Sequence, residues 1–274
     1  MSDAKVALVT GASSGIGADT ARLLHEQGFA VYAVARRVEP MQPLAQLGVH
    51  AFAMDVTDEA SITSGVAKII AEAGRIDVLV NNAGYGSYGA VEDVPLDEAR
   101  RQFEVNLFGL ARLIQLVVPH MRARGSGRIV NVSSIGGKIY EPLGAWYHAT
   151  KFAVEGLSDS LRIELHPFGI GVVLIEPGPI LSEWNAIARQ SIAKTSGGGA
   201  YAERAASIAK VFETVDAKGR SSKPVVVAQK IVKAATVKRP RARYPVGRSA
   251  GTIMRVRKML PDRAMDAIIT RMFR

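Results

Sequence analysis

The chain has 274 residues, a hydrophobic fraction of 48%, no cysteine and a formal net charge of +10. The lack of cysteine excludes disulfide bonds and thiolate metal sites, and the apolar content is typical of a globular protein rather than a disordered one. Neither a secretion signal nor an apolar run of about 20 residues is evident, so we expect a soluble, cytoplasmic protein.

Short β-branched runs alternate along the chain with longer amphipathic segments, a pattern typical of a parallel sheet covered by helices on both faces. We therefore expect an α/β fold, a Rossmann-type, doubly wound domain with a seven-stranded parallel sheet flanked by helices. The expected strands are residues 6–10, 30–35, 50–54, 78–81, 128–133, 171–176 and 242–246. The expected helices are residues 16–27, 61–73, 96–124 with a break near Asn106, and 145–166.

The regular alternation lapses over residues 185–223, where three consecutive glycines at 197–199 precede a helical pattern over 201–215. An irregular excursion of this length beside a sheet favours a mobile substrate lid. No linker divides the chain, so we expect residues 1–274 to form a single domain that ends in a basic extension over residues 248–274.

The first expected strand runs into a glycine-rich loop, and a helix begins there. Gly11, Gly15 and Gly17 have the spacing Gly-x-x-x-Gly-x-Gly. Glycines allow a tight turn and let backbone N–H groups approach a pyrophosphate at the positive end of the helix. A turn without a ligand is the alternative, but the strand–turn–helix context favours a dinucleotide. The loop residues expected to contact it are Gly11, Ser13, Ser14, Gly15, Ile16 and Gly17.

The end of the second expected strand distinguishes between the two nicotinamide cofactors. A site for NAD(H) places an acidic residue about 20 residues beyond the glycines, where it binds the ribose 2′-hydroxyl. Here that position holds Arg36 and Arg37 and no acid. Guanidinium groups bind phosphate through paired, charge-assisted hydrogen bonds, so the sequence favours NADP(H) over NAD(H). Two solvated arginines at a strand end are the alternative.

Three residues form a candidate set for proton transfer. Tyr147 and Lys151 are four residues apart in an expected helix and share one face. A free tyrosine has a pKa of about 10, and a nearby ammonium lowers that pKa by favouring the phenolate. Ser134 ends an expected strand, at the edge where ligands of open α/β sheets bind, and its hydroxyl can hold a substrate oxygen. A lone Tyr-x-x-x-Lys pair arises by chance, but with this serine it predicts acid–base chemistry on a carbonyl or an alcohol.

Together these motifs resemble the short-chain dehydrogenase/reductase family over roughly residues 5–185. The matching segments are Thr10-Gly11-x-x-x-Gly15-x-Gly17, Asp55-Val56, Asn81-Asn82-Ala83-Gly84, Asn106, Ser134, Tyr147-x-x-x-Lys151 and Pro177-Gly178-Pro179-Ile180. One departure is Ser182, where the family often has threonine, and its hydroxyl preserves the expected contact. The residues around Tyr147 are similar to those of the hydroxysteroid and retinol dehydrogenase branch, which implies a hydrophobic substrate.

The resemblance implies roles for further residues. Asp55 and Val56 would border the adenine, and Asn106 would hold a water in a proton relay that reaches Lys151. The backbone of Ile180 would meet the nicotinamide carboxamide. The cofactor contacts implied in this way are Asp55, Val56, Asn82, Ala83, Gly84, Tyr147, Lys151, Pro177, Gly178, Ile180 and Ser182.

The functional hypothesis is an NADP(H)-dependent oxidoreductase that interconverts a secondary alcohol and a ketone or aldehyde on a steroid-, retinoid- or lipid-like substrate. Its catalytic residues would be Asn106, Ser134, Tyr147 and Lys151, with Tyr147 as general acid and base. The alternative is a non-catalytic NADP(H)-binding sensor or scaffold, which needs the glycine loop but no proton donor. The resemblance also implies a homodimer or homotetramer, formed through the helices near residues 107–124 and 145–166.

The positive charge is concentrated at the C-terminus. Residues 218–274 hold 16 basic and 2 acidic residues, a balance of +14, and the rest of the chain holds 19 basic and 23 acidic residues, a balance of −4. An apolar stripe at helical spacing consists of Met265, Ile268, Ile269, Met272 and Phe273, with Arg263, Arg271 and Arg274 off it. One reading is a helix packed on the fold or on a second subunit, and the other is a helix on an anionic membrane surface.

Other binding partners find little support in the sequence. We expect no nucleic acid, because no recognition motif accompanies the charge, and no metal, because no His, Asp or Glu cluster has ligand spacing. Trp184 begins the expected lid and is a better candidate than Trp146 to line a pocket. His148 adjoins Tyr147 but points to a different helix face, so we expect it to pack or to be solvated.

Overall fold

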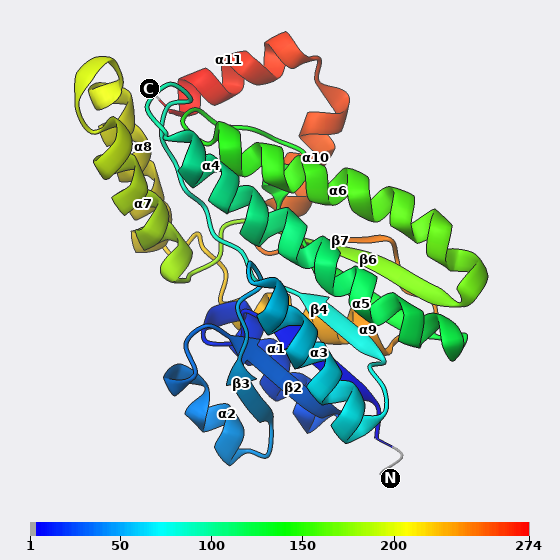
Figure 1. The fold of residues 1–274 in the computed structure, drawn as a ribbon. Helices are drawn as coiled ribbons and strands as arrows, with labels where there is room; N and C mark the ends of the chain where they lie inside the picture. The colour runs from blue at the N-terminus through cyan, green and yellow to red at the C-terminus, as the bar shows by residue number, and fades with distance from the viewer. Residues whose placement is uncertain (1–3, 274) are drawn as a thin grey trace.

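The computed structural model describes residues 4–273, apart from the side chain of Asp216. Its centre is a seven-stranded parallel sheet with the strand order β3-β2-β1-β4-β5-β6-β7 (Figure 1). The strands are β1 (Val6–Thr10), β2 (Ala30–Ala35), β3 (His50–Ala53), β4 (Val78–Asn81), β5 (Gly127–Val132), β6 (Ile170–Pro177) and β7 (Arg243–Val246). Each expected strand is present, with ends that differ by one residue at most, which confirms the doubly wound α/β fold.

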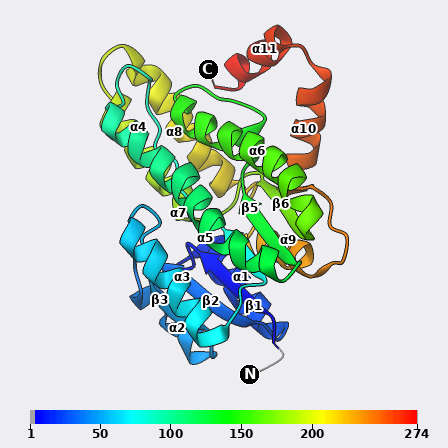
Figure 2. The same ribbon diagram turned by 45° about the vertical axis from the view of Figure 1, so that its right-hand side comes forward.

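Helices cover both faces of the sheet and one end of the molecule (Figures 1 and 2). They are α1 (Gly15–Glu26), α2 (Gln42–Gln46), α3 (Glu59–Ala73), α4 (Leu96–Phe103), α5 (Gly109–Ala123), α6 (Ala145–Leu165), α7 (Glu183–Ser196), α8 (Ala202–Ala217), α9 (Pro224–Thr236), α10 (Ala250–Met259) and α11 (Asp262–Met272). Short 3₁₀ segments span Glu39–Met41, Ile135–Gly137, His166–Phe168 and Gly199–Tyr201.

Strand residues alternate between two apolar cores, one on each face of the sheet. In β1, Ala7 and Val9 belong to the core that α1 and α9 cover, whereas Val6 and Leu8 belong to the core that α3, α5 and α6 cover. Because successive side chains of a strand point to opposite faces, a strand covered on both sides is apolar throughout. Parallel pairing then brings the carboxyl ends of β1, β4, β5 and β6 to the same edge.

The expected break near Asn106 is confirmed as a π-helix over Glu104–Phe108, which joins α4 and α5 in one continuous helical run. Such single-turn widenings of an α-helix are frequent at functional sites. The π-helix packs against α6 and holds Asn106 buried between them. This packing brings Asn106 next to α6, the helix that carries Tyr147 and Lys151.

α7, α8 and α11 gather at the end of the molecule away from the N-terminus (Figures 1 and 2). They help to enclose a third apolar core, whose buried members are Tyr88, Ala90, Leu143, Tyr147, Ala188, Ile192, Ala205, Ile208, Phe212, Met265, Ile269 and Phe273. The helix expected over residues 201–215 is confirmed as α8, but the stretch before it, expected to be irregular, is the helix α7. The buried residues Ala188, Ile192 and Ser196 recur every four positions, yet two of them are small, which weakens the apolar pattern.

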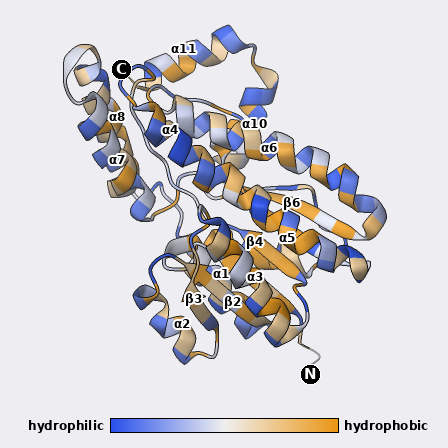
Figure 3. Ribbon diagram, in the orientation of Figure 1, coloured by the Kyte–Doolittle hydropathy of each residue, from blue (hydrophilic) through white to orange (hydrophobic). Residues whose placement is uncertain are grey.

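The basic extension forms two helices, α10 and α11, which carry both polar and apolar residues (Figure 3). Three members of the expected apolar stripe are buried in the third core, namely Met265, Ile269 and Phe273. The other two, Ile268 and Met272, are exposed, and Arg274 lies outside the described residues. For the three buried residues, packing on the fold is confirmed. Across residues 4–273 we find no helix long and apolar enough to cross a membrane.

Candidate active site

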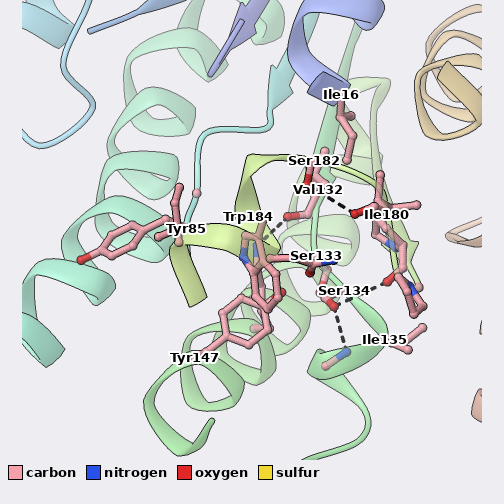
Figure 4. Close-up of a pocket in the computed structure, with 18 of the residues that line it drawn as sticks. Ile16, Tyr85, Val132, Ser133, Ser134, Ile135, Tyr147, Ile180, Ser182 and Trp184 are labelled. Carbon is pink, nitrogen blue, oxygen red and sulfur yellow. Dashed lines mark hydrogen bonds between the residues drawn. The ribbon is translucent and has the colours of Figure 1, made fainter. Parts of the chain in front are cut away.

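A cavity of about 970 Å³ follows the carboxyl edge of the sheet from the glycine loop to α11. All the expected site residues line it except Gly17 and Asn106. In the close-up of Figure 4, Ser134 lies between Tyr147 and Ile180, and Ile16 and Ser182 lie above them in the view. The cavity therefore joins the expected cofactor residues to the expected proton-transfer residues.

The glycine loop has the shape of a cradle. Gly11 adopts a left-handed backbone (φ +66°), and a Cβ there would lie 2.9 Å from Ala83 Cα, a distance that side chains do not tolerate. At Gly17 a Cβ would lie 2.2 Å from the Gly11 carbonyl oxygen. Gly17 thus acts through the close packing of helix on loop, which explains why it does not line the cavity. The loop leaves open space above Gly15, where a Cβ would meet nothing closer than 3.9 Å.

The segment that follows β4 fastens this loop. The Thr10 hydroxyl oxygen accepts hydrogen bonds from the backbone N–H groups of Asn82 and Ala83, both at 3.0 Å. The Asn82 side-chain amide donates to the carbonyl oxygens of Thr10 (3.0 Å) and Gly11 (3.2 Å). Asn82 therefore holds the loop in place with its side chain, and the open cradle, the start of α1 and the nearby arginines together fit a phosphorylated dinucleotide.

Arg36 and Arg37 follow β2 and line the cavity with exposed side chains. A guanidinium nitrogen of Arg37, Nη2, lies 3.1 Å from Glu183 Oε2, which also accepts a hydrogen bond from the Ser14 hydroxyl at 3.4 Å. Glu183 is the first residue of α7. One exposed ion pair therefore links this arginine to the base of the helical pair α7–α8.

Ser134 and Tyr147 meet at the centre of the cavity. Ser134 Oγ accepts a hydrogen bond from the Gly136 N–H (3.0 Å) and donates a long one to the Pro177 carbonyl (3.5 Å), as Figure 4 shows. Burial raises the pKa of the Tyr147 phenol to about 12, the hydrogen bond with Ser134 acts to lower it, and the negative charge of Glu141 acts to raise it. The net direction is opposite to the lowered pKa that the sequence predicts, because burial outweighs the other effects.

Lys151 lies one turn beyond Tyr147 on α6 and is buried. Its Nζ donates a hydrogen bond to the Val132 carbonyl at 3.0 Å. Burial lowers the pKa of the Lys151 amine to about 8, against the raising effect of the Glu155 carboxylate. The ammonium form is therefore much less favoured here than in water.

Asn106 lies behind the cavity wall with its side chain fully engaged. Its Oδ1 accepts the N–H of Tyr85 at 3.0 Å, and its Nδ2 donates to the Tyr85 carbonyl (2.9 Å) and to the Thr150 hydroxyl (3.0 Å). A Cβ on Gly84 would lie 3.1 Å from Asn106 Oδ1 and 3.7 Å from Lys151 Nζ. Gly84 therefore keeps a narrow space beside both side chains.

Several lining residues were missed by the sequence reasoning. Tyr88, Phe212 and Glu141 line the cavity, and they come from separate segments with no common spacing that could have pointed to them. Trp184 lines it as expected, and its ring lies beside that of Tyr147 (Figure 4). Trp146 is absent from the lining within the described chain.

His148 also lines the cavity, and its ring centroid lies 5.6 Å from that of Tyr147, so the different helix face expected for it does not keep it out of the site. Its Nε2 lies 3.1 Å from the Glu141 backbone N–H, which can only donate, so this nitrogen is the acceptor. Its Nδ1 lies 2.9 Å from the Gly136 carbonyl and carries the proton. The ring is buried and packed, as expected, and this pairing fits a neutral imidazole. Within residues 4–273, no three His, Cys, Asp or Glu side chains are grouped as metal ligands would be.

Comparison with known proteins assigns a family to this fold and site. The family described as short chain dehydrogenase matches residues 5–193. A probable short-chain type dehydrogenase/reductase, VdlC, of Helicobacter pylori is 35% identical over 263 residues, which are 96% of each chain. The chain therefore belongs to the short-chain dehydrogenase/reductase family of oxidoreductases.

Two further relatives carry more specific names. A 3-ketodihydrosphingosine reductase of Bacteroides thetaiotaomicron is 45% identical over 175 residues, 64% of this chain and 63% of that one. An NADPH-dependent 3-dehydrocapnine reductase of Ornithobacterium rhinotracheale is 34% identical over 276 residues, 96% of this chain and 95% of that one.

Solved structures agree with this assignment. A short-chain dehydrogenase from Streptomyces avermitilis superposes with a TM-score of 0.83 at 35% identity, covering 99% of this chain and 97% of that one. A metagenomic short-chain oxidoreductase in complex with NADP superposes with a TM-score of 0.69 at 28% identity, covering 88% and 95%.

Proposed function

We propose that the protein reduces a ketone or aldehyde to an alcohol, or catalyses the reverse, with NADP(H), on a hydrophobic, lipid-like substrate. The observation that carries this proposal is the cavity itself. The glycine loop and the two arginines line one part of it, the cofactor half, and Tyr88, Trp184 and Phe212 line another, the substrate half. The same cavity is lined by Ser134, Tyr147 and Lys151. A carbonyl oxygen held by the Ser134 and Tyr147 hydroxyls would face the dinucleotide on one side and the apolar wall on the other.

In reduction, Tyr147 would donate its phenolic proton to the carbonyl oxygen as the carbon accepts hydride. When bound, NADPH supplies that hydride. With a pKa of about 12, Tyr147 stays protonated at neutral pH and is ready to donate. Lys151 would stabilise the phenolate that is left, and Asn106, through Thr150 and the Gly84 segment, would fix the wall behind Lys151 and carry the proposed proton relay.

The cofactor proposal rests on the residues that line the cofactor half of the cavity. Arg36 and Arg37 would bind the 2′-phosphate of NADP(H), and the loop from Gly11 to Ile16 would bind the pyrophosphate. Asp55 and Val56 would border the adenine, and Ala83 and Gly84 would support the dinucleotide. The nicotinamide would meet Pro177, Gly178, Ile180 and Ser182. The NADPH-dependent relative and the NADP complex support the choice of NADP(H).

The substrate proposal rests on the residues that line the substrate half of the cavity. Tyr88, Trp184 and Phe212 line it together with the buried residues of α11, so an apolar substrate would fit. Two relatives act, by name, on 3-ketodihydrosphingosine and 3-dehydrocapnine. Their names favour a lipid-like ketone over a steroid or a retinoid. We further propose that residues 185–223, which include most of α7 and all of α8, act as the lid of this single-domain protein.

We also propose that the protein forms a homodimer or a homotetramer. The helical run 104–123 and α6, where the family resemblance implies a subunit contact, carry the exposed apolar side chains Phe108, Phe152 and Ile163. A second copy packed there would bury them. Ile163→Asp would then lower the mass measured by sedimentation equilibrium, whereas an unchanged mass would count against this interface.

Contact of a cytoplasmic enzyme with a membrane surface is also proposed, on the basis of α10 and α11. Met259, Ile268 and Met272 are exposed on these basic helices, and exposed apolar residues among cations favour binding to anionic lipid. Sedimentation with anionic vesicles, and none with neutral vesicles, is the expected result. Equal recovery in the supernatant with both would remove this part of the proposal.

The central test combines cofactor binding with turnover. NADPH and NADH are titrated by nicotinamide fluorescence, and a panel of ketones, steroids and retinoids is then added. We expect tighter binding of NADPH and turnover of a lipid-like ketone, and Tyr147→Phe should abolish turnover while NADPH still binds. Binding without turnover on the whole panel would favour the sensor or scaffold alternative.

A further inference from the structure

Glu141 places a carboxylate inside the substrate half of the cavity. It belongs to the loop between the 3₁₀ segment Ile135–Gly137 and α6, and its side chain is 19% exposed. One carboxylate oxygen, Oε1, accepts a hydrogen bond from the Tyr88 hydroxyl at 2.6 Å. The Tyr88 ring in turn lies 5.7 Å from the ring of Tyr147, measured between centroids. The negative charge of Glu141 is therefore close to the proposed proton donor.

This carboxylate has no cationic partner within the described residues, where no lysine or arginine lies within 4.0 Å of it. The ring nitrogen Nε2 of His148 is 3.9 Å from Oε1, but that nitrogen accepts the backbone N–H of Glu141, so the imidazole is neutral in this arrangement. The second oxygen, Oε2, makes no hydrogen bond among these residues. Keeping a carboxylate largely out of water without a counter-ion is costly.

The charge also opposes the proposed chemistry. Glu141 acts to raise the pKa of Tyr147, because a second negative charge disfavours the phenolate that forms when the phenol gives up its proton. A cation placed at the carboxylate would cancel this effect. An ammonium group on the substrate would bring such a cation at the moment when proton transfer requires it.

The surrounding rings suit a cation as well. Tyr88 is 5.6 Å from Trp184 and 5.5 Å from Phe212, and Trp184 lies 5.1 Å from Tyr147, all measured between ring centroids. Figure 4 shows the last pair side by side. Aromatic faces attract ammonium groups, and more strongly when water is excluded. One carboxylate beside several aromatic rings is thus a chemical match for an amine.

We propose that Glu141 binds the ammonium group of the substrate, and that the substrate is a long-chain ketone with a protonated amine close to the carbonyl. This inference rests on the proposed function and narrows its substrate class. The apolar chain would lie along Met265 and Ile269 of α11 and along Phe273, which follows that helix, and all three line the same cavity. An amine next to a carbonyl has a pKa of about 8, like a chain α-amino group, so it is charged at neutral pH.

Binding of an unreactive amine tests the inference without turnover. Dodecylamine and dodecanol differ only in the polar head, and their binding with NADP(H) present is followed by tryptophan fluorescence. We expect dodecylamine to bind at least about tenfold more tightly than dodecanol, since a charge-assisted hydrogen bond supplies that factor. Glu141→Gln keeps the size and the acceptor for Tyr88, and it should remove this preference, whereas Glu141→Asp should keep part of it.

Glu98→Gln is the matched control. Glu98 also accepts a tyrosine hydroxyl, that of Tyr85 at 3.0 Å, but it does not line the cavity. This variant should retain the preference for dodecylamine. Equal affinity of the unmodified protein for the two probes, or an equal preference in Glu141→Gln, would overturn the inference.

Turnover distinguishes the inference from the proposed function. Octadecan-3-one, 2-aminooctadecan-3-one and its N-acetyl derivative share one chain, and only the second is a cation. We expect kcat/KM to be highest for the amine, and Glu141→Gln to lower it about tenfold for the amine without lowering it for the neutral ketones. Reduction of all three at equal rates would overturn the inference and leave the function standing. No reduction of any ketone would overturn the function, and the dodecylamine preference would then still decide whether Glu141 binds an amine.

Discussion

The indole of Trp184 lies over the phenol of Tyr147, with 5.1 Å between the ring centroids and 59° between the ring planes. Trp184 is the second residue of α7, so the helical pair over residues 183–217 reaches the proposed proton donor directly. Tyr147 is only 7% exposed as a result of such contacts. Substrate access to the phenol therefore depends on where this indole lies.

Removing the indole should widen the site. We expect Trp184→Ala to raise kcat/KM for bulky, branched ketones relative to straight-chain ketones by about threefold or more, because the space of a large side chain becomes free. Steady-state kinetics on both kinds of ketone measure the ratio. Trp146→Ala, which changes a tryptophan outside the cavity lining, is the control and should leave the ratio unchanged. The same change for both kinds of ketone in Trp184→Ala would contradict a gating position.

The two arginines after β2 should decide cofactor choice. Replacing both Arg36 and Arg37 by alanine removes the guanidinium groups proposed to bind the 2′-phosphate, and we expect NADPH affinity to fall about 10- to 100-fold while NADH affinity stays within about twofold. Fluorescence titration of both cofactors gives the comparison. A parallel loss for NADH would point to general damage of the loop instead of lost phosphate recognition.

Glu183 competes for one of these arginines. Its Oε2 lies 3.1 Å from Arg37 Nη2, and both side chains are more than half exposed. Exposed ion pairs contribute roughly 0.2–1 kcal/mol, so Glu183→Gln should strengthen NADPH binding by up to about fivefold by releasing Arg37. Isothermal titration of NADPH checks this, and a weaker affinity in the variant would show that Glu183 supports the site instead.

Glu176 on β6 should limit stability above neutral pH. It is fully buried, and its oxygens accept no hydrogen bond within the described residues, although Arg243 Nε lies 3.4 Å from Oε1. Burial raises the pKa of Glu176 to about 7, the Glu155 charge adds to this, and Arg243 opposes it. The raised pKa means that stability is lost as pH rises from about 4.5 through 7, where the unfolded chain has already released the proton.

Glu176→Gln removes this titration. We expect the variant to gain about 1–3 kcal/mol in free energy of unfolding at pH 8 relative to its change at pH 5, because a buried carboxylate is no longer formed. Urea denaturation at the two pH values measures the difference. An identical effect of the substitution at both would mean that Glu176 does not change its charge on unfolding in this range.

The buried Lys151 amine should lower the free energy of unfolding at neutral pH, although the proposed reaction requires this residue. Burial lowers its pKa from 10.5 to about 8, so the stability linked to this group is present above pH 10.5 and is lost as pH falls through about 8. Lys151→Met should raise the free energy of unfolding at pH 7 by about 1–3 kcal/mol, after the loss of the bond to Val132, and abolish turnover. The stability gain, measured with urea, should shrink as pH approaches 10; a gain that is constant with pH would argue against a depressed pKa.

The residues of the cofactor half could be predicted from the sequence because the motifs that reveal them are local. Gly11, Gly15 and Gly17 are fixed by backbone requirements within one turn, and Arg36 follows at a spacing set by one strand–helix–strand unit. The fold followed for the same reason, since strands covered on both faces are apolar runs. The break at Asn106 was also visible, although its π-helical form was not.

Most residues of the substrate half could not be predicted from the sequence, because segments far apart in the chain form it. Tyr88, Glu141 and Phe212 share a cavity only after the loops and α8 pack together, and no spacing rule connects them. The pKa of Tyr147 was misjudged for a related reason. A neighbouring lysine can be read from sequence, whereas the degree of burial, which controls the pKa here, depends on the whole third core.

The family match ends at residue 193, whereas part of the cavity wall comes from α8 and α11, which follow it. The wall around the substrate is thus built from two stretches of the chain, because Tyr88, Glu141 and Trp184 precede residue 193 and the residues of α8 and α11 follow it. The second stretch carries none of the reacting groups Ser134, Tyr147 and Lys151, so it can change in evolution without altering the chemistry. Chimaeras joined near residue 193 would keep the head-group contacts of the first parent and take the part of the wall formed by α8 and α11 from the second.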